Sequence, residues 1–312
     1  MHEKSSIIGL LRNNIVIIAL LGLLAVMGIL SKSFLTVSNI INILTQISIY
    51  GIVACAMTFA IICGEFDLSV GSLLAVVTIL FIDMAKTHGF VTAILSSLLM
   101  GAAVGAINGF LVSRVKISAF VATLSLMVSL KGLALFYTNG KPINFVNDGM
   151  YELGNGSFLG IPYIVLMFFG AVAISHFVLR YTRFGRNIYA TGGNMNVAKM
   201  AGIDVVFYKF IIFVILGIVT AIAGMIMACR LNSGNSLFGN DLAMSVVAAV
   251  VIGGTSLSGG RGSAVKTLLG MLVIGVLFNA LLILGVQANW QDVIKGVILI
   301  IVVSFDAFFT RK

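Results

Sequence analysis

The chain has 312 residues and a formal net charge of +9, and only 9% of its residues are charged while 60% are hydrophobic. Soluble globular proteins carry about 25% charged residues, so this composition excludes a water-soluble fold, a disulfide scaffold and a disordered chain. Together with a mean hydropathy of +1.16, it predicts an integral membrane protein.

The basic excess does not indicate nucleic-acid binding, because no basic run with interleaved aromatic residues occurs. Lys and Arg instead collect in cytoplasmic loops of membrane proteins. The three cysteines and three histidines are scattered and show no metal-ligand spacing. We therefore predict no catalytic, cofactor or metal site.

Ten apolar segments are predicted to span the membrane, because a helix needs about 20 apolar residues to cross roughly 30 Å of hydrocarbon. The weakest are the second and the eighth, which contain polar residues or are short. The segments are 13–30, 39–63, 68–85, 90–112, 118–137, 161–180, 209–229, 242–256, 264–285 and 291–309. We expect one all-α membrane domain covering residues 1–312.

The distribution of basic residues predicts the orientation of these spans. With ten spans and a cytoplasmic N-terminus, most Lys and Arg residues fall in inner segments. Those in outer loops are Lys32, Lys86, Lys141 and Arg230. This bias predicts that both termini are cytoplasmic.

The segment Gly64–Ser72 interrupts the apolar pattern between the second and third spans with two carboxylates, Glu65 and Asp67. Such groups are costly at membrane depth unless they face water, protein or a helix terminus. Asp67 and Ser69 are placed to cap the third span. The segment is therefore either part of a solute pathway or gate, or a capped turn. An acid–base enzyme is disfavoured because no His or Lys lies nearby in sequence.

The fourth span carries Gly101, Gly105 and Gly109 on one helical face. Glycines four residues apart allow close approach of helix backbones in lipid, so this stripe predicts helix packing. Asn108 lies beside the stripe and is expected to hydrogen-bond to a neighbouring helix. We include it among the pathway or gate candidates.

Two larger loops are expected on opposite sides of the membrane. The outer loop, 138–160, is rich in Gly and Asn, and the inner loop, 180–209, carries five basic side chains. Within the inner loop, Asn194 is predicted to cap a short helix, Met195–Ala201, that ends at Gly202. A short helix held by glycine-containing turns suits docking of a soluble partner; the alternative is an amphipathic surface loop.

A faint repeat relates the third and eighth spans. Asp67-Leu68 and Ala75–Val77 recur as Asp241-Leu242 and Ala249–Val251. Halves of five spans each would have opposite orientations, which is the inverted-repeat design of many transporters. We treat two inverted halves as one possibility and chance matches in an apolar chain as the other.

Two further polar segments are given no functional role. Gly253–Gly262 resembles a phosphate-binding loop, but a glycine stands where the motif requires lysine, and we interpret the segment as a flexible inner turn. Asp292 and Lys295 are three residues apart in the last span and are expected to neutralise one another.

Four motifs in the same order give the chain a resemblance to the membrane permeases of ribose-type sugar ABC importers, which also serve galactose, xylose and autoinducer uptake. The resemblance covers nearly the whole chain. Its motifs are Gly64–Ser72, Gly185–Asn194 with Gly202-Ile203, Val251–Gly262, and Trp290-Gln291 through Lys295-Gly296 to Asp306. Glu65-Phe66 stands where the family usually has Gly-Ile.

The resemblance implies a multi-pass permease of the bacterial inner membrane that moves a pentose or hexose, or a furanosyl autoinducer, and carries out no covalent chemistry. It also implies a second permease, either an identical copy or a sister permease, together with an ABC ATPase on the cytoplasmic face and a periplasmic sugar-binding protein. The residues it places in the ATPase coupling loop are Gly185, Asn187, Tyr189, Gly192, Gly193, Asn194, Lys199 and Gly202. The alternative is an ion-coupled secondary carrier that uses Glu65 and Asp67 as its ion site.

Overall fold

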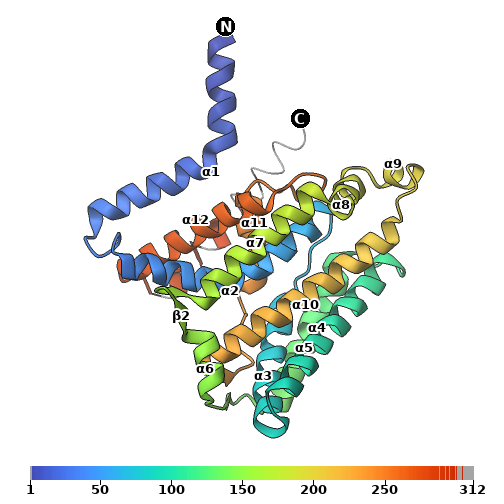
Figure 1. The fold of residues 1–312 in the computed structure, drawn as a ribbon. Coiled ribbons are helices and arrows are strands. Elements are labelled where there is room, and N and C mark those ends of the chain that lie inside the picture. Colours follow the sequence, from blue (N-terminus) through green and yellow to red (C-terminus); the bar gives the residue numbers. More distant parts are fainter. Residues whose placement is uncertain are drawn as a thin grey trace.

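The computed structural model describes residues 2–287, 289–291, 293, 294, 296–298, 300 and 304. In this part of the chain, long helices form the body of the molecule, and short strands and helices lie at its two ends (Figure 1). The pair Asp292 and Lys295 lies outside the described residues.

Seven helices are long and apolar enough to cross a membrane. They are α2 (Val37–Ile62), α3 (Val70–His88), α4 (Phe90–Ser113), α5 (Ala119–Thr138), α7 (Tyr163–Tyr181), α10 (Val205–Leu231) and α12 (Ala264–Ile283). These correspond to seven of the ten predicted spans. The predicted tenth span falls largely outside the described residues.

The other two predicted spans are shorter apolar helices. The apolar part of α1 (His2–Leu30) is Val16–Leu30, and α11 (Leu242–Ile252) has 11 residues. At 1.5 Å per residue, α11 is about 16 Å long, which is too short to cross the bilayer alone. Its length is limited by Asp241 before it and by Gly253 and Gly254 after it, so the predicted span 242–256 is too long.

The small elements lie at opposite ends of the molecule. The loop 138–160 is folded and contains β1 (Ile143–Asn144), α6 (Asp148–Asn155) and β2 (Ser157–Phe158), and it is followed by β3 (Ile161–Pro162). β1 pairs antiparallel with β4 (Ser233–Gly234), and β2 pairs antiparallel with β3. At the other end lie α8 (Arg183–Gly193) and α9 (Met195–Met200) (Figure 1).

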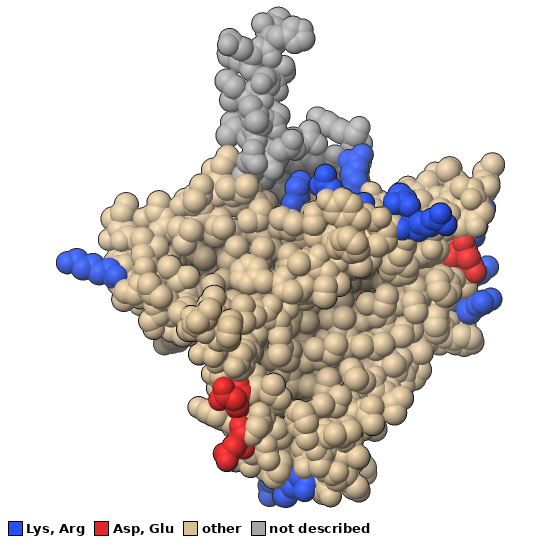
Figure 2. All heavy atoms as spheres, in the orientation of Figure 1, with Lys and Arg blue, Asp and Glu red and all other residues tan. Residues whose placement is uncertain are grey.

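Charged side chains follow the same division. Figure 2 shows most of the visible Lys and Arg at the end where α8 and α9 lie, a few more at the opposite end and on one flank, acidic residues near α6 and near α9, and a largely uncharged surface between the two ends. The exposed basic residues of the α8 and α9 end include Arg180, Arg183, Arg186, Lys199, Arg261 and Lys266. An uncharged band between two polar ends is what a membrane-spanning body requires.

The glycine stripe of α4 lies against α10. A Cβ atom at Gly101 would lie 2.5 Å from the Gly217 carbonyl oxygen, and one at Gly105 would overlap the Phe213 carbonyl oxygen. At Gly109 the nearest atom would be the Phe210 carbonyl oxygen, at 2.8 Å. These helices therefore meet backbone to backbone, which only glycine permits.

The start of α3 and the loop before α11 meet inside the molecule. The first turn of α3 meets the loop from β4 to α11, because a Cβ atom at Gly71 would overlap the carbonyl oxygen of Gly239. From this meeting point α3 runs toward the α6 end, whereas α11 runs toward the α8 end (Figure 1). The two Asp-Leu sequences thus precede helices that begin close together and lead to opposite ends.

Candidate functional site

The polar turn between α2 and α3 is built around the buried carboxylate of Asp67. The backbone N–H and the hydroxyl of Ser69 donate to Asp67 Oδ1 at 2.7 and 2.6 Å. The side-chain amide of Asn108 donates to Asp67 Oδ2 at 3.0 Å and to Ser69 Oγ at 2.9 Å. Three of the four gate candidates therefore form one hydrogen-bonded cluster that ties the turn to α4.

This cluster corrects the capping interpretation. Ser69 occupies the N-cap position of α3 with φ −75° and ψ −12°, and its side chain makes no capping hydrogen bond. Asp67 accepts the N–H of Ser69 itself rather than an N–H of the first helical turn. The hydroxyl of Ser69 is used on Asp67 instead, because the buried carboxylate needs donors.

The fourth candidate, Glu65, forms an ion pair with Lys209 on α10. Both side chains are largely buried, with 11% and 15% of their surface exposed. The sequence could not indicate this pair, because the two residues are 144 positions apart. Glu65 and Asp67 are thus held by different partners on different helices.

Three chain segments meet at the end of α2. The N–H of Gly260 donates to the Ile62 carbonyl oxygen at 2.8 Å. A Cβ atom at Gly192 would overlap that same oxygen, and one at Gly259 would lie 2.7 Å from the Gly192 carbonyl oxygen and 3.1 Å from Gly64. The segment 253–262 is therefore packed against α8 and α2, and its interpretation as a flexible turn is wrong.

The helix α8 is a third correction. Its residues were expected to form glycine-containing turns, yet Arg183–Gly193 is helical and begins where Thr182 Oγ1 accepts the N–H of Gly185. A Cβ atom at Gly185 would overlap carbonyl oxygens of α7. Glycine lowers helix propensity by about 1 kcal/mol, but at this position only glycine allows α8 to approach α7 so closely.

Side chains fix α8 to its surroundings. Asn187 donates to the Tyr208 hydroxyl at 2.7 Å, and the Tyr189 hydroxyl donates to the Gly262 carbonyl oxygen at 2.8 Å. Burial raises the pKa of Tyr189 above its ordinary value, so the hydroxyl keeps its proton and this hydrogen bond at neutral pH.

The helix α9 follows the predicted pattern closely. Asn194 Oδ1 accepts the N–H groups of Asn196 and Val197, both at 3.1 Å. Gly202 has φ +80° and lies one position beyond the C-cap Ala201. Its N–H donates to the Lys199 carbonyl oxygen, and that of Ile203 donates to the Ala198 carbonyl oxygen, which is a Schellman motif.

Apolar side chains are exposed on α9. Met195, Val197 and Met200 expose 40%, 59% and 89% of their surface, and Lys199 is exposed beside them. Exposed apolar groups at a basic end of the molecule suit contact with a protein rather than with water.

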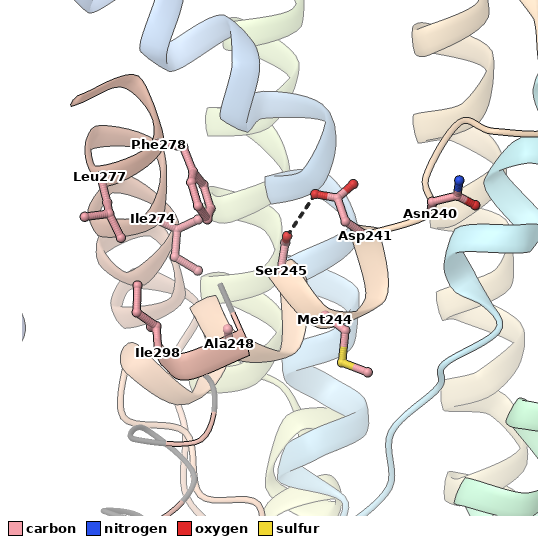
Figure 3. Close-up of a pocket in the computed structure, with 10 residues that line it drawn as sticks. Asn240, Asp241, Met244, Ser245, Ala248, Ile274, Leu277, Phe278 and Ile298 are labelled. Carbon is pink, nitrogen blue, oxygen red and sulfur yellow. Dashed lines mark hydrogen bonds between the residues drawn. The ribbon is translucent and has the colours of Figure 1, made fainter. Parts of the chain in front are cut away.

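A cavity of about 430 Å³ lies between α11 and α12. Figure 3 shows Asp241 and Ser245 at the start of α11 on one side, and Ile274, Leu277 and Phe278 of α12 on the other. Among the described residues, those that line it are Asn240, Asp241, Met244, Ser245, Ala248, Ile274, Leu277, Phe278, Gly296 and Ile298. Sequence reasoning missed this site, although Asp241 belongs to the faint repeat.

Polar groups of the cavity converge on Asp241. The Tyr50 hydroxyl of α2 donates to Asp241 Oδ1 at 2.8 Å, and the Ser245 hydroxyl lies 3.4 Å from Oδ2 (Figure 3). Asp241 is the N-cap residue of α11, and its side chain, like that of Ser69 at the start of α3, makes no capping hydrogen bond.

Residues 39–303 match the family model described as branched-chain amino acid transport system / permease component. The chain is 39% identical to the ribose import permease protein of Escherichia coli (strain K12) over 93% of this chain and 92% of that protein. It is 41% identical to the ribose import permease protein of Bacillus subtilis (strain 168), over 91% and 89%. It is 36% identical to an L-arabinose ABC transporter permease protein of Azospirillum brasilense, over 95% and 88%.

No solved structure matches the chain. The matches to permeases nevertheless extend over the spans, the polar turn, α8, α9 and the cavity residues. This chain therefore belongs to the ribose-type sugar permeases of ABC transporters, which are multi-pass proteins of the bacterial inner membrane.

Proposed function

We propose that this chain forms the translocation pathway of an ATP-driven monosaccharide importer and that α8 and α9 bind a separate ATPase. The observation that carries this proposal is the backbone contact of Gly192 in α8 with Ile62 at the end of α2 and with the segment 253–262. A force applied to α8 acts directly on the loops that lead into α3 and follow α11.

The energetic logic is a shift of populations between conformations. An ATPase that binds one orientation of α8 more tightly than another stabilises the corresponding arrangement of the bundle. The Glu65–Lys209 ion pair ties the polar turn to the first turns of α10, and the Asp67 cluster ties it to α4. These contacts make α8, the turn and α10 move as connected parts.

The two remaining partners are expected to contact other parts of the molecule. A periplasmic sugar-binding protein would dock at the end that carries α6 and the small strands, and a second permease copy would complete the pathway in the bilayer. The names of the relatives above include ribose and L-arabinose, which supports a pentose as the substrate. In this orientation we expect both termini to be cytoplasmic.

The structure gives less support to an ion-coupled carrier. Glu65 is paired with a lysine, and Asp67 accepts hydrogen bonds from Ser69 and Asn108, so the two carboxylates do not converge on a shared ion. An ion site built from them would require both sets of contacts to be broken.

The docking proposal is tested with two exposed apolar residues at opposite ends of the molecule. Met200 on α9 is 89% exposed and Leu159 at the α6 end is 87% exposed. We expect Met200→Glu to weaken ATPase association with the purified permease at least tenfold, because a charge would face the contact surface. Leu159→Glu is the matched control and should bind the ATPase as wild type does.

The measurement is the dissociation constant of the detergent-purified permease for its ATPase subunit. Loss of binding in both variants, or in neither, would contradict docking on α9.

A further inference from the structure

A second pocket, of about 410 Å³, lies at the basic end of the molecule. It is formed where α8 meets the end of α7 and the start of α12 (Figure 1). The residues that line it are His176, Leu179 and Arg180 of α7, Arg186 and Tyr189 of α8, and Gly262, Ser263 and Ala264 where α12 begins.

The pocket carries positive charge that no carboxylate neutralises. Arg180 and Arg186 lie on its walls, and both side chains are exposed. In the part of the chain that the structure describes, neither arginine forms an ion pair or donates a side-chain hydrogen bond. The Arg180 guanidinium lies 5.8 Å from the centre of the Tyr181 ring. The N–H groups of both guanidinium groups therefore remain available to an anion.

The start of α12 adds further donors. A helix leaves its first N–H groups without partners inside the helix, and these groups carry the positive end of the helix dipole. Ser263 is the N-cap residue of α12, but its side chain makes no capping hydrogen bond. The N–H groups of the first turn, beginning with Ala264 at the pocket, can therefore bind a phosphate oxygen.

Contacts within the protein already hold the walls of the pocket together. The Tyr189 hydroxyl donates to the Gly262 carbonyl oxygen at 2.8 Å, which joins α8 to the residues that precede α12. At Gly185 the backbones of α8 and α7 approach too closely to admit a Cβ atom. Binding of an anion would thus require the ordering of little more than two arginine side chains.

The pocket lies at the level of the lipid headgroups. The spanning helix α7 has 19 residues and is about 28 Å long, so its last turn, which carries Arg180, lies at one boundary of a hydrocarbon core of roughly 30 Å. On the same helix, Ile174, Phe177 and Tyr181 are 66%, 60% and 61% exposed and share one helical face. An apolar stripe therefore leads from the pocket into the bilayer, which suits a ligand with an anionic head and an apolar tail.

We propose that this pocket binds the phosphate headgroup of an anionic phospholipid. Arg180, Arg186 and the first N–H groups of α12 surround the phosphate, and an acyl chain lies along Phe177 and Ile174. Arginine suits this role because its planar fork matches a phosphate group, and basic pockets between membrane helices bind such headgroups. The inference goes beyond the proposed transport function and depends neither on the sugar nor on the ATPase. One phosphate would bridge α7, α8 and α12.

The test is native mass spectrometry of the detergent-purified full-length permease, titrated with dioleoylphosphatidylglycerol or with zwitterionic dioleoylphosphatidylcholine. We expect the Kd for phosphatidylglycerol to be at least tenfold lower than that for phosphatidylcholine. Arg180→Gln/Arg186→Gln should weaken phosphatidylglycerol binding at least fivefold. The matched control is Arg183→Gln, which alters an exposed arginine of α8 outside the pocket and should change the Kd less than twofold.

Further arms separate a lipid from other anions. Phe177→Ser should weaken phosphatidylglycerol binding at least twofold, and neither an excess of inorganic phosphate nor the ATPase subunit should displace the bound lipid. Arg186→Gln alone should weaken binding at least twofold and replaces the double variant if that variant does not fold, as judged by gel filtration and melting temperature. Equal Kd values for the two lipids, or an equal loss in Arg183→Gln and the pocket variants, would overturn the proposal. Displacement by phosphate would instead indicate a site for a soluble anion, and displacement by the ATPase a protein contact; either would overturn the lipid assignment.

Discussion

The contact of α8 with the end of α2 gives the sharpest prediction, because the adjacent residues Gly192 and Gly193 leave very different room for a side chain there. A Cβ atom at Gly192 would overlap the Ile62 carbonyl oxygen and lie 2.8 Å from the Ile62 carbonyl carbon and 2.9 Å from the Gly260 nitrogen. At Gly193 the nearest atom would be the Gly260 Cα, at 3.9 Å. Alanine should therefore be tolerated at 193 and disruptive at 192.

The magnitude follows from the geometry. Non-bonded heavy atoms prefer separations of about 3.5–4.0 Å, so Gly192→Ala must push the two backbones apart by roughly 1.5 Å or more. Overpacking of this kind costs about 1–3 kcal/mol. Stretching the 2.8 Å bond from Gly260 to Ile62 costs about 0.5–1.5 kcal/mol more, and the better helix propensity of alanine returns at most about 1 kcal/mol.

The net loss for Gly192→Ala is thus about 1–3 kcal/mol, whereas Gly193→Ala gains up to about 1 kcal/mol. The two variants thus differ by about 1–4 kcal/mol, and at about 2–4 °C per kcal/mol the melting temperature of Gly192→Ala should lie roughly 2–16 °C below that of Gly193→Ala. Thermal unfolding in detergent, followed by size-exclusion fluorescence, measures this difference.

Coupling is the second readout of the same pair. With the ATPase present, Gly192→Ala should lower sugar uptake per ATP hydrolysed at least threefold, while Gly193→Ala keeps the wild-type ratio. Equal melting temperatures and equal uptake ratios for the two variants would refute the argument that α8 transmits movement through this contact.

Two further contacts give predictions of the same kind. Ser69 and Asn108 donate hydrogen bonds to the Asp67 carboxylate, so Asp67→Asn should lower the free energy of unfolding by about 1–3 kcal/mol. The exchange Asp67→Asn/Asn108→Asp should recover most of this loss in thermal unfolding. An Asp67→Asn variant with the wild-type melting temperature would show that the carboxyl is protonated. Gly105→Ala should separate α4 from α10 and lower the free energy of unfolding by about 1–3 kcal/mol. Gly132→Ala is the control and should be neutral or stabilising, because no atom lies within 4 Å of the added methyl group. Equal melting temperatures of the two variants would contradict backbone contact at the glycine stripe of α4.

Features that depend on local sequence could be predicted well. Apolar length indicated the seven spans, and the spacing of Gly101, Gly105 and Gly109 indicated a packing face. The cap at Asn194 and the left-handed residue at Gly202 also follow from their immediate neighbours, because capping depends on the side chain and backbone of a few consecutive residues.

Features that depend on distant contacts could not be predicted. Lys209 approaches Glu65 across 144 positions and Tyr50 approaches Asp241 across 191, and no local pattern encodes either approach. The helix α8 was missed because glycine disfavours helix in isolation, whereas its close contact with other backbones exists only in the folded molecule.

The central claim is that ATP hydrolysis by a partner drives sugar through this chain. The most direct measurement is uptake of labelled ribose into proteoliposomes that hold the permease, its ATPase and the sugar-binding protein, with proton and sodium gradients collapsed by ionophores. We expect uptake that requires ATP and the ATPase and does not change when the gradients are collapsed. Uptake by the permease alone, driven by an imposed proton or sodium gradient and insensitive to ATP, would contradict the claim.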